Sequence, residues 1–121
     1  MTQTVNYGVI GCGMMGQEHL RNIALLDGAR VSAVFEPNAA MADAASAIAP
    51  GAQIVGSVDA LLAVDALECI LIASPNFCHV AQMEEIAAKR PLPLLVEKPL
   101  FTDPEDAERL MVLRDGYTAP I

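Results

Sequence analysis

Three glycines near the N-terminus, Gly11, Gly13 and Gly16, follow an apolar run that ends at Ile10. This G-x-G-x-x-G spacing is typical of a strand that turns into a helix, where unpaired N–H groups and the helix dipole favour an anion. Alone it is a weak signal, and it becomes informative when an acidic residue follows about 20 positions later. Glu36 stands 36 − 16 = 20 residues after Gly16. The pattern therefore predicts a pyrophosphate site whose carboxylate binds a ribose.

The elements around these residues alternate between strand and helix, as such a site requires. Strands are predicted at 5–10, 31–35, around 54–55, 66–73 and 92–96, and helices at 14–26, 39–49, 58–62, 77–89 and 103–113. Thr102 and Glu105 have the spacing of a capping box for the last helix. The alternation predicts an α/β fold, a doubly wound and mostly parallel sheet of about five strands in the order 3-2-1-4-5.

Ligands of such sheets bind at the carboxyl ends of the strands, where the strand order reverses. The predicted strands end at Gly11, at Glu36, at Ser74-Pro75-Asn76 and at Glu97-Lys98. We therefore expect these four groups to converge on one crevice.

Three motifs in chain order give a family resemblance. They are the glycine turn continued to His19, Ser74-Pro75-Asn76-x-x-His79 after the fourth strand, and Glu97-Lys98-Pro99 after the fifth. Together they resemble the glucose-fructose oxidoreductase and inositol dehydrogenase family, often written Gfo/Idh/MocA, over the chain up to residue 116. The resemblance implies a Rossmann domain at residues 1–116, a short tail at 117–121, and an NAD(P)-dependent oxidoreductase acting on a sugar, cyclitol or related polyol.

The resemblance also implies a role for each motif. Glu36 would bind the adenosine ribose, Glu97 would lie near the nicotinamide ribose, and Lys98 would be the catalytic residue that directs its ammonium at the substrate oxygen. The family often has a cis peptide bond at the position of Lys98–Pro99. The other cofactor-binding residues would be Gly11, Cys12, Gly13, Met14, Met15, Gly16, Ser74, Pro75, Asn76 and His79.

Simpler interpretations stand beside these roles. Lys98 could pair with Glu97 at the sheet edge, and His79 could form a hydrogen bond across a loop. We interpret His19 as a packing residue or a hydrogen bond on a helix face. Cys12 is either a reactive thiol at a helix N-terminus or, as we favour, a small filler.

Met14, Met15 and Glu36 have expected roles around the cofactor. Met14 and Met15 are interpreted as an adaptable apolar wall around it. Glu36 favours NAD over NADP, because a 2′-phosphate would face a carboxylate that has no Arg beside it. The alternative for Glu36 is an exposed acid at a strand end.

Net charge and cysteine content argue against several kinds of partner and site. With 7 Lys and Arg against 15 Asp and Glu, the net charge of −8 opposes nucleic-acid binding. The three cysteines, without C-x-x-C spacing, predict neither a disulfide framework nor a metal site, and they favour a cytoplasmic protein. No apolar stretch approaches the ~18 residues that cross a bilayer, so no membrane partner is expected.

The chain of 121 residues leaves five after Gly116, too few for the sixth strand and the substrate domain that the family places there. We therefore expect a cofactor domain, a truncated product that binds a dinucleotide without turnover. The alternatives are a binding module without catalysis and an assembly domain. In the latter, the uncovered edge of the fifth strand would pair with a second copy to give a homo-oligomer.

Overall fold

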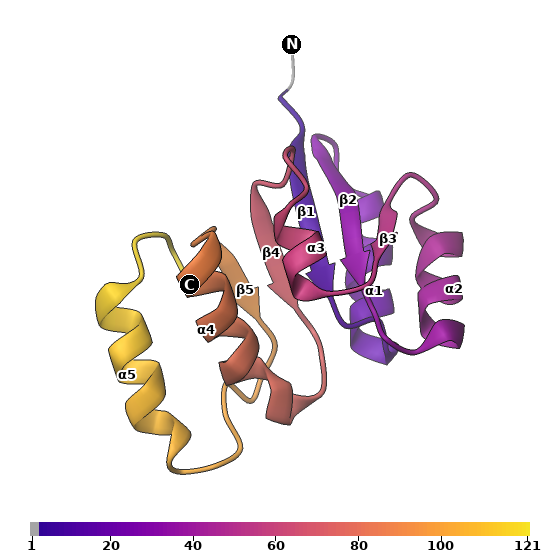
Figure 1. The fold of residues 1–121 in the computed structure, drawn as a ribbon. Coiled ribbons are helices and arrows are strands. Elements are labelled where there is room, and N and C mark those ends of the chain that lie inside the picture. The colour runs from indigo at the N-terminus through magenta and orange to yellow at the C-terminus, as the bar shows by residue number, and fades with distance from the viewer. Residues whose placement is uncertain (1–2) are drawn as a thin grey trace.

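A computed structural model describes residues 3–121 and shows one five-stranded sheet flanked by helices (Figure 1). The strands are β1 (Val5–Ile10), β2 (Ala29–Phe35), β3 (Gln53–Val55), β4 (Cys69–Ile72) and β5 (Leu94–Val96). Every neighbouring pair is parallel, and the strand order is β3-β2-β1-β4-β5. The predicted α/β fold and strand order are confirmed.

The helices cover both faces of the sheet. One face packs against α1 (Met14–Ala24) and α2 (Ala39–Ile48). The other packs against α3 (Val58–Leu62), α4 (His79–Lys89) and α5 (Asp106–Gly116), and a short 3-10 turn η1 (Asn76–Cys78) precedes α4.

The central strands are buried on both faces, which explains their unbroken apolar runs. In β1, Val9 packs toward α1 and α2 while Ile10 packs toward the opposite helices. In β4, Leu71 packs toward α1 and α2, and Ile70 and Ile72 pack toward α3, α4 and α5. Burial on both sides fixes where β1 and β4 end, and so fixes the turns that follow them.

The predicted capping box at the start of α5 is wrong. The helix begins at Asp106, and no side chain caps its first turn. Asp103 instead forms a local turn, in which its carboxylate accepts from the Glu105 N–H at 3.0 Å and its carbonyl accepts from the Asp106 N–H at 2.9 Å. An Asp before a proline favours such a turn, because proline fixes φ and has no N–H to donate.

Residues 117–121 lie beside β5. The Tyr117 hydroxyl donates to the Leu92 carbonyl, and the Leu94 N–H donates to the Pro120 carbonyl at 2.9 Å. These residues form no strand of the sheet, but they occupy one amide on the outer edge of β5. Pairing of a second copy along that edge stays a prediction.

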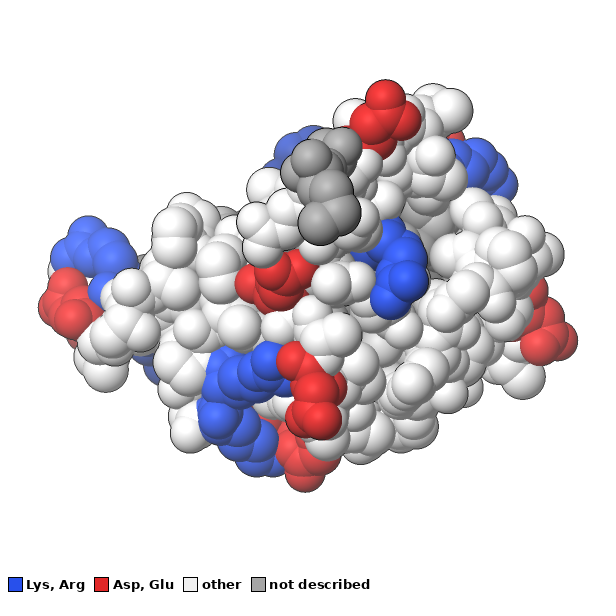
Figure 2. All heavy atoms as spheres, turned by 90° about the horizontal axis from the view of Figure 1, so that it is seen from above, with Lys and Arg blue, Asp and Glu red and all other residues white. Residues whose placement is uncertain are grey.

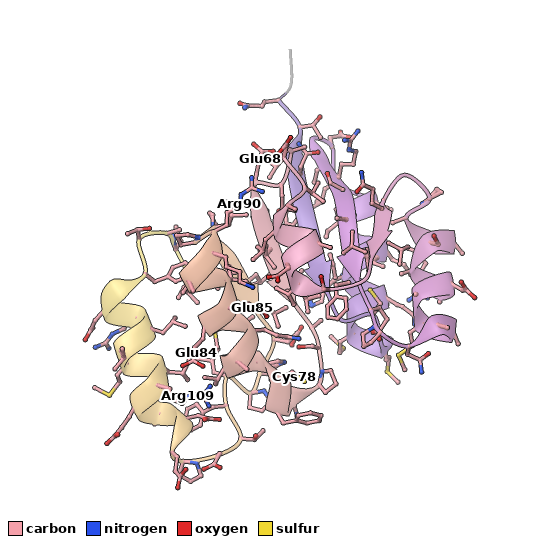
Figure 3. All side chains as sticks on the ribbon, viewed as in Figure 1. Glu68, Cys78, Glu84, Glu85, Arg90 and Arg109 are labelled. Carbon is pink, nitrogen blue, oxygen red and sulfur yellow. The ribbon has the colours of Figure 1, made fainter. Side chains whose placement is uncertain are left out.

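Several charged side chains form ion pairs on the surface. Glu84 of α4 and Arg109 of α5 point toward one another and form an ion pair (Figure 3). Lys89 pairs with Asp59 and Glu85. Figure 2, which looks onto the amino ends of the strands, shows red and blue residues beside one another on a mostly uncharged surface. Within residues 3–121, no helix has both the length and the apolar character of a membrane span.

Candidate functional site

A cleft of about 780 Å³ opens at the carboxyl ends of β1, β2 and β4, the lower end of the sheet in Figure 1. It is larger than the hollow of about 560 Å³ between α4 and α5. Seven of the predicted site residues line it, namely Gly11, Gly13, Met14, Met15, Glu36, Ser74 and Pro75. Three of the four predicted groups therefore meet in one crevice.

The three glycines of the turn differ in what an added Cβ would contact. Gly11 has a φ of +93°, and a Cβ there would lie 2.4 Å from the backbone nitrogen of Ser74. A Cβ on Gly16 would lie 2.0 Å from the Gly11 carbonyl oxygen, so this glycine lets α1 pack closely on the turn. A Cβ on Gly13 would have no neighbour within 4 Å. Gly13 therefore borders open space in the cleft.

The amino end of α1 faces this open space without a cap of its own. Gly13 is the N-cap residue, no side chain caps the helix, and its first turn carries no acidic residue. The first-turn amides can therefore donate to an anion. Met14 is 86% exposed and Met15 is 49% exposed, so both are wall residues of the cleft, as interpreted from the sequence.

Glu36 holds the turn from the end of β2. One carboxylate oxygen accepts from the Cys12 N–H at 2.7 Å and the other from the Asn38 N–H at 2.9 Å. An ionised carboxylate has about four lone-pair sites, so two accepted bonds leave capacity for ribose hydroxyls. Among residues 3–121, Glu36 is the only charged residue that lines the cleft.

Cys12 lies beneath the turn and is fully buried. Burial, with a smaller contribution from the Glu36 carboxylate, raises the pKa of its thiol to about 12. Desolvation therefore outweighs the helix N-terminus, which lowers thiol pKa values at exposed sites. The filler interpretation is confirmed and the reactive-thiol alternative is wrong.

The turn after β4 borders the cleft through Ser74 and Pro75, while Asn76 lies outside its lining. The Ser74 hydroxyl donates to the Gln82 side chain of α4. His79 is fully buried and does not line the cleft. Its Nδ1 lies 2.8 Å from the Pro99 carbonyl oxygen and its Nε2 lies 2.9 Å from that of Ser74. The predicted hydrogen bond across a loop is therefore confirmed.

The segment after β5 lies beyond the cleft lining and contacts α1. His19 Nε2 lies 2.6 Å from Glu97 Oε1, which confirms the helix-face hydrogen bond. This bond, with a smaller contribution from Lys98, holds the pKa of Glu97 below its usual range. Within residues 3–121, no side-chain ion pair joins Lys98 to Glu97. The Lys98–Pro99 peptide bond is cis, as the resemblance implied.

Sequence reasoning missed several residues that line the cleft. Those nearest the predicted groups are Phe35, Pro37, Asn38, Met41, Phe77, Cys78 and Gln82. Some could have been found, because the residues that flank Glu36 and the two between Asn76 and His79 follow the same strand ends. Cys78, labelled in Figure 3, lies at this end of the molecule. Met41 and Gln82 depend on how α2 and α4 pack.

Comparison with known proteins agrees with this geometry. Residues 5–117 match the model of a family described as "Oxidoreductase family, NAD-binding Rossmann fold". The chain is 38% identical over 121 residues to an inositol 2-dehydrogenase of Corynebacterium glutamicum strain R. That match covers 99% of this chain and 36% of the relative, so the chain spans about a third of the relative's length.

Two crystal structures are similar in fold and carry dinucleotides. The myo-inositol dehydrogenase of Lactobacillus casei, in complex with NAD(H) and myo-inositol, superposes with a TM-score of 0.83 at 29% identity, covering 92% of this chain and 33% of that one. A 3-ketoreductase of Actinomadura kijaniata, in complex with NADP and TDP-benzene, has a TM-score of 0.78 at 25% identity, covering 94% and 35%. Structures similar to this chain therefore hold either dinucleotide.

Proposed function

Because the chain belongs to the oxidoreductase family with the NAD-binding Rossmann fold, we propose that it binds NAD in the cleft at the carboxyl ends of β1, β2 and β4. The observation that carries the proposal is the open space at Gly13 beside the uncapped amino end of α1. A pyrophosphate needs close approach to backbone amides, and this is where the turn permits it.

The preference for NAD over NADP rests on Glu36. Its carboxylate is fixed by two backbone amides, so it cannot readily turn away from a 2′-phosphate. No Arg or Lys lines the cleft within residues 3–121 to offset the repulsion. A ribose with free hydroxyls can instead donate to the carboxylate, and this favours NAD.

We propose further that residues 1–116 are the cofactor domain of an enzyme that oxidises a secondary hydroxyl of a cyclitol, sugar or related polyol. The nicotinamide would supply the hydride acceptor. In this chain, the residues at the glycine turn and Glu36 would hold the cofactor. Lys98 would orient the substrate oxygen through its ammonium, which stabilises negative charge developing there. Turnover requires a substrate held beside the cofactor, and residues 1–121 would supply only part of the cleft that holds it. We therefore expect no turnover from these residues alone.

Titration calorimetry with NAD and NADP tests this proposal. We expect NAD to bind at least about tenfold more tightly than NADP, which corresponds to about 1.4 kcal/mol. Glu36→Gln should narrow the ratio to below about threefold, because it removes the charge that repels the 2′-phosphate. Glu108→Gln, the same change on exposed α5, should leave the ratio unaltered.

The outcomes separate the parts of the proposal. Equal affinity of the unmodified chain for both dinucleotides would remove the NAD preference and leave dinucleotide binding in place. Absence of binding by either one, in a chain shown to be folded, would overturn the proposed function. Oxidation of a polyol by the 121 residues would overturn only the expectation of no turnover. Cytoplasmic location and a homo-oligomer stay predictions.

A further inference from the structure

Two histidines from different helices hold the residues on either side of Lys98. His19 of α1 contacts the Glu97 carboxylate at 2.6 Å, and His79 of α4 contacts the Pro99 carbonyl at 2.8 Å. Lys98 itself lies between these two held residues. Contacts to the residue before Lys98 and to the residue after it therefore restrict the position of its backbone.

The ring of His79 has a backbone carbonyl oxygen beside each of its nitrogens. Nδ1 faces the carbonyl of Pro99, and Nε2 faces that of Ser74. A carbonyl oxygen accepts hydrogen bonds, so a ring N–H directed at either one forms a hydrogen bond.

His79 is fully buried at the first residue of α4. Buried polar atoms are stable only where they have hydrogen-bond partners, and the two carbonyls supply them at 2.8 and 2.9 Å. Replacing the ring would therefore remove contacts to both the turn after β4 and the segment after β5.

We propose that His19 and His79 are positioning residues for Lys98. His19 acts through the Glu97 carboxylate, and His79 acts through the Pro99 carbonyl. The same ring binds the Ser74 carbonyl, so it ties the turn that lines the cleft to the segment that carries Lys98. The inference rests on the proposed function for the role of Lys98, but the contacts can be tested without any cofactor.

NMR of the ring tests the contacts of His79. The chain contains two histidines, so His19→Gln leaves His79 as the only imidazole. We expect a ring N–H signal that is protected from exchange with water, because the buried N–H donates to a backbone carbonyl. A ring N–H that exchanges as fast as that of an exposed histidine would overturn these contacts.

Amide hydrogen exchange tests the positioning. We expect His79→Gln to speed exchange at Glu97, whose N–H donates to the Ile72 carbonyl, by at least about fivefold relative to the strand amides of β1. His19→Gln should give a smaller local increase, and it keeps the test informative if His79→Gln does not fold. Lys89→Gln, on exposed α4 surface, controls for a general loss of stability.

Unchanged local exchange in both histidine variants would overturn the positioning role. Failure of NAD binding would overturn the proposed function and leave both measurements intact, because neither contains dinucleotide.

Discussion

Replacing Gly16 with alanine is expected to lower the free energy of unfolding by about 3 kcal/mol, the upper end of the usual cost of overpacking. The added Cβ would lie 2.0 Å from the Gly11 carbonyl oxygen and 2.8 Å from its carbonyl carbon. These are backbone atoms of the turn, so no side-chain rotation relieves the clash. Helix α1 would have to move off the sheet, and Leu20 and Ile23 would lose part of their buried contact.

Urea unfolding followed by circular dichroism measures this effect as a lower midpoint at similar slope. The matched control is Gly116→Ala at the end of α5, where a Cβ would meet nothing within 4 Å. A midpoint for Gly16→Ala close to that of the unmodified chain would show that α1 does not approach the turn as closely as described.

Gly13→Ala is expected to weaken NAD binding on the order of 100-fold. Its methyl group would occupy the space through which a pyrophosphate approaches the turn. The fold should tolerate the change. Gly13 has a φ of −72°, which alanine adopts freely, and its Cβ would contact nothing. We expect the free energy of unfolding to change by less than about 1 kcal/mol, since a poorer N-cap offsets a stiffer unfolded chain.

Calorimetry and urea unfolding on the same preparation check both halves of this prediction. Gly56→Ala, which also meets nothing within 4 Å and lies outside the cleft lining, should alter neither quantity greatly. Unchanged affinity in Gly13→Ala would mean that the anion does not approach at this residue. A large loss of stability would mean that Gly13 supports the fold instead.

The sheet could be predicted because its signals are local. Apolar runs at β1 and β4 mark strands buried on both faces, and each is followed by residues that cannot continue it, Gly11 in one case and Ser74-Pro75 in the other. The strand-end rule then places these turns and Glu36 around one crevice, which the structure confirms.

The details that could not be predicted depend on how deeply a side chain is buried and on contacts between residues far apart in the sequence. The position of Cys12 at a helix start suggested activation, but its full burial decides its chemistry. His19 meets Glu97 across 78 residues of sequence, and His79 meets Pro99 across 20. Neither contact can be predicted from local pattern, because each needs the packing of a helix against the segment after β5.

The cleft would hold an anion with backbone amides alone, since Glu36 is the only charged residue in its lining over the part of the chain that the structure describes. Sites built from Lys and Arg attract anions over long range, and added salt weakens them. Here the long-range field of a chain with net charge −8 opposes the approaching dinucleotide. Moderate ionic strength screens that field while short-range amide contacts persist, so salt should assist cofactor capture instead of impeding it.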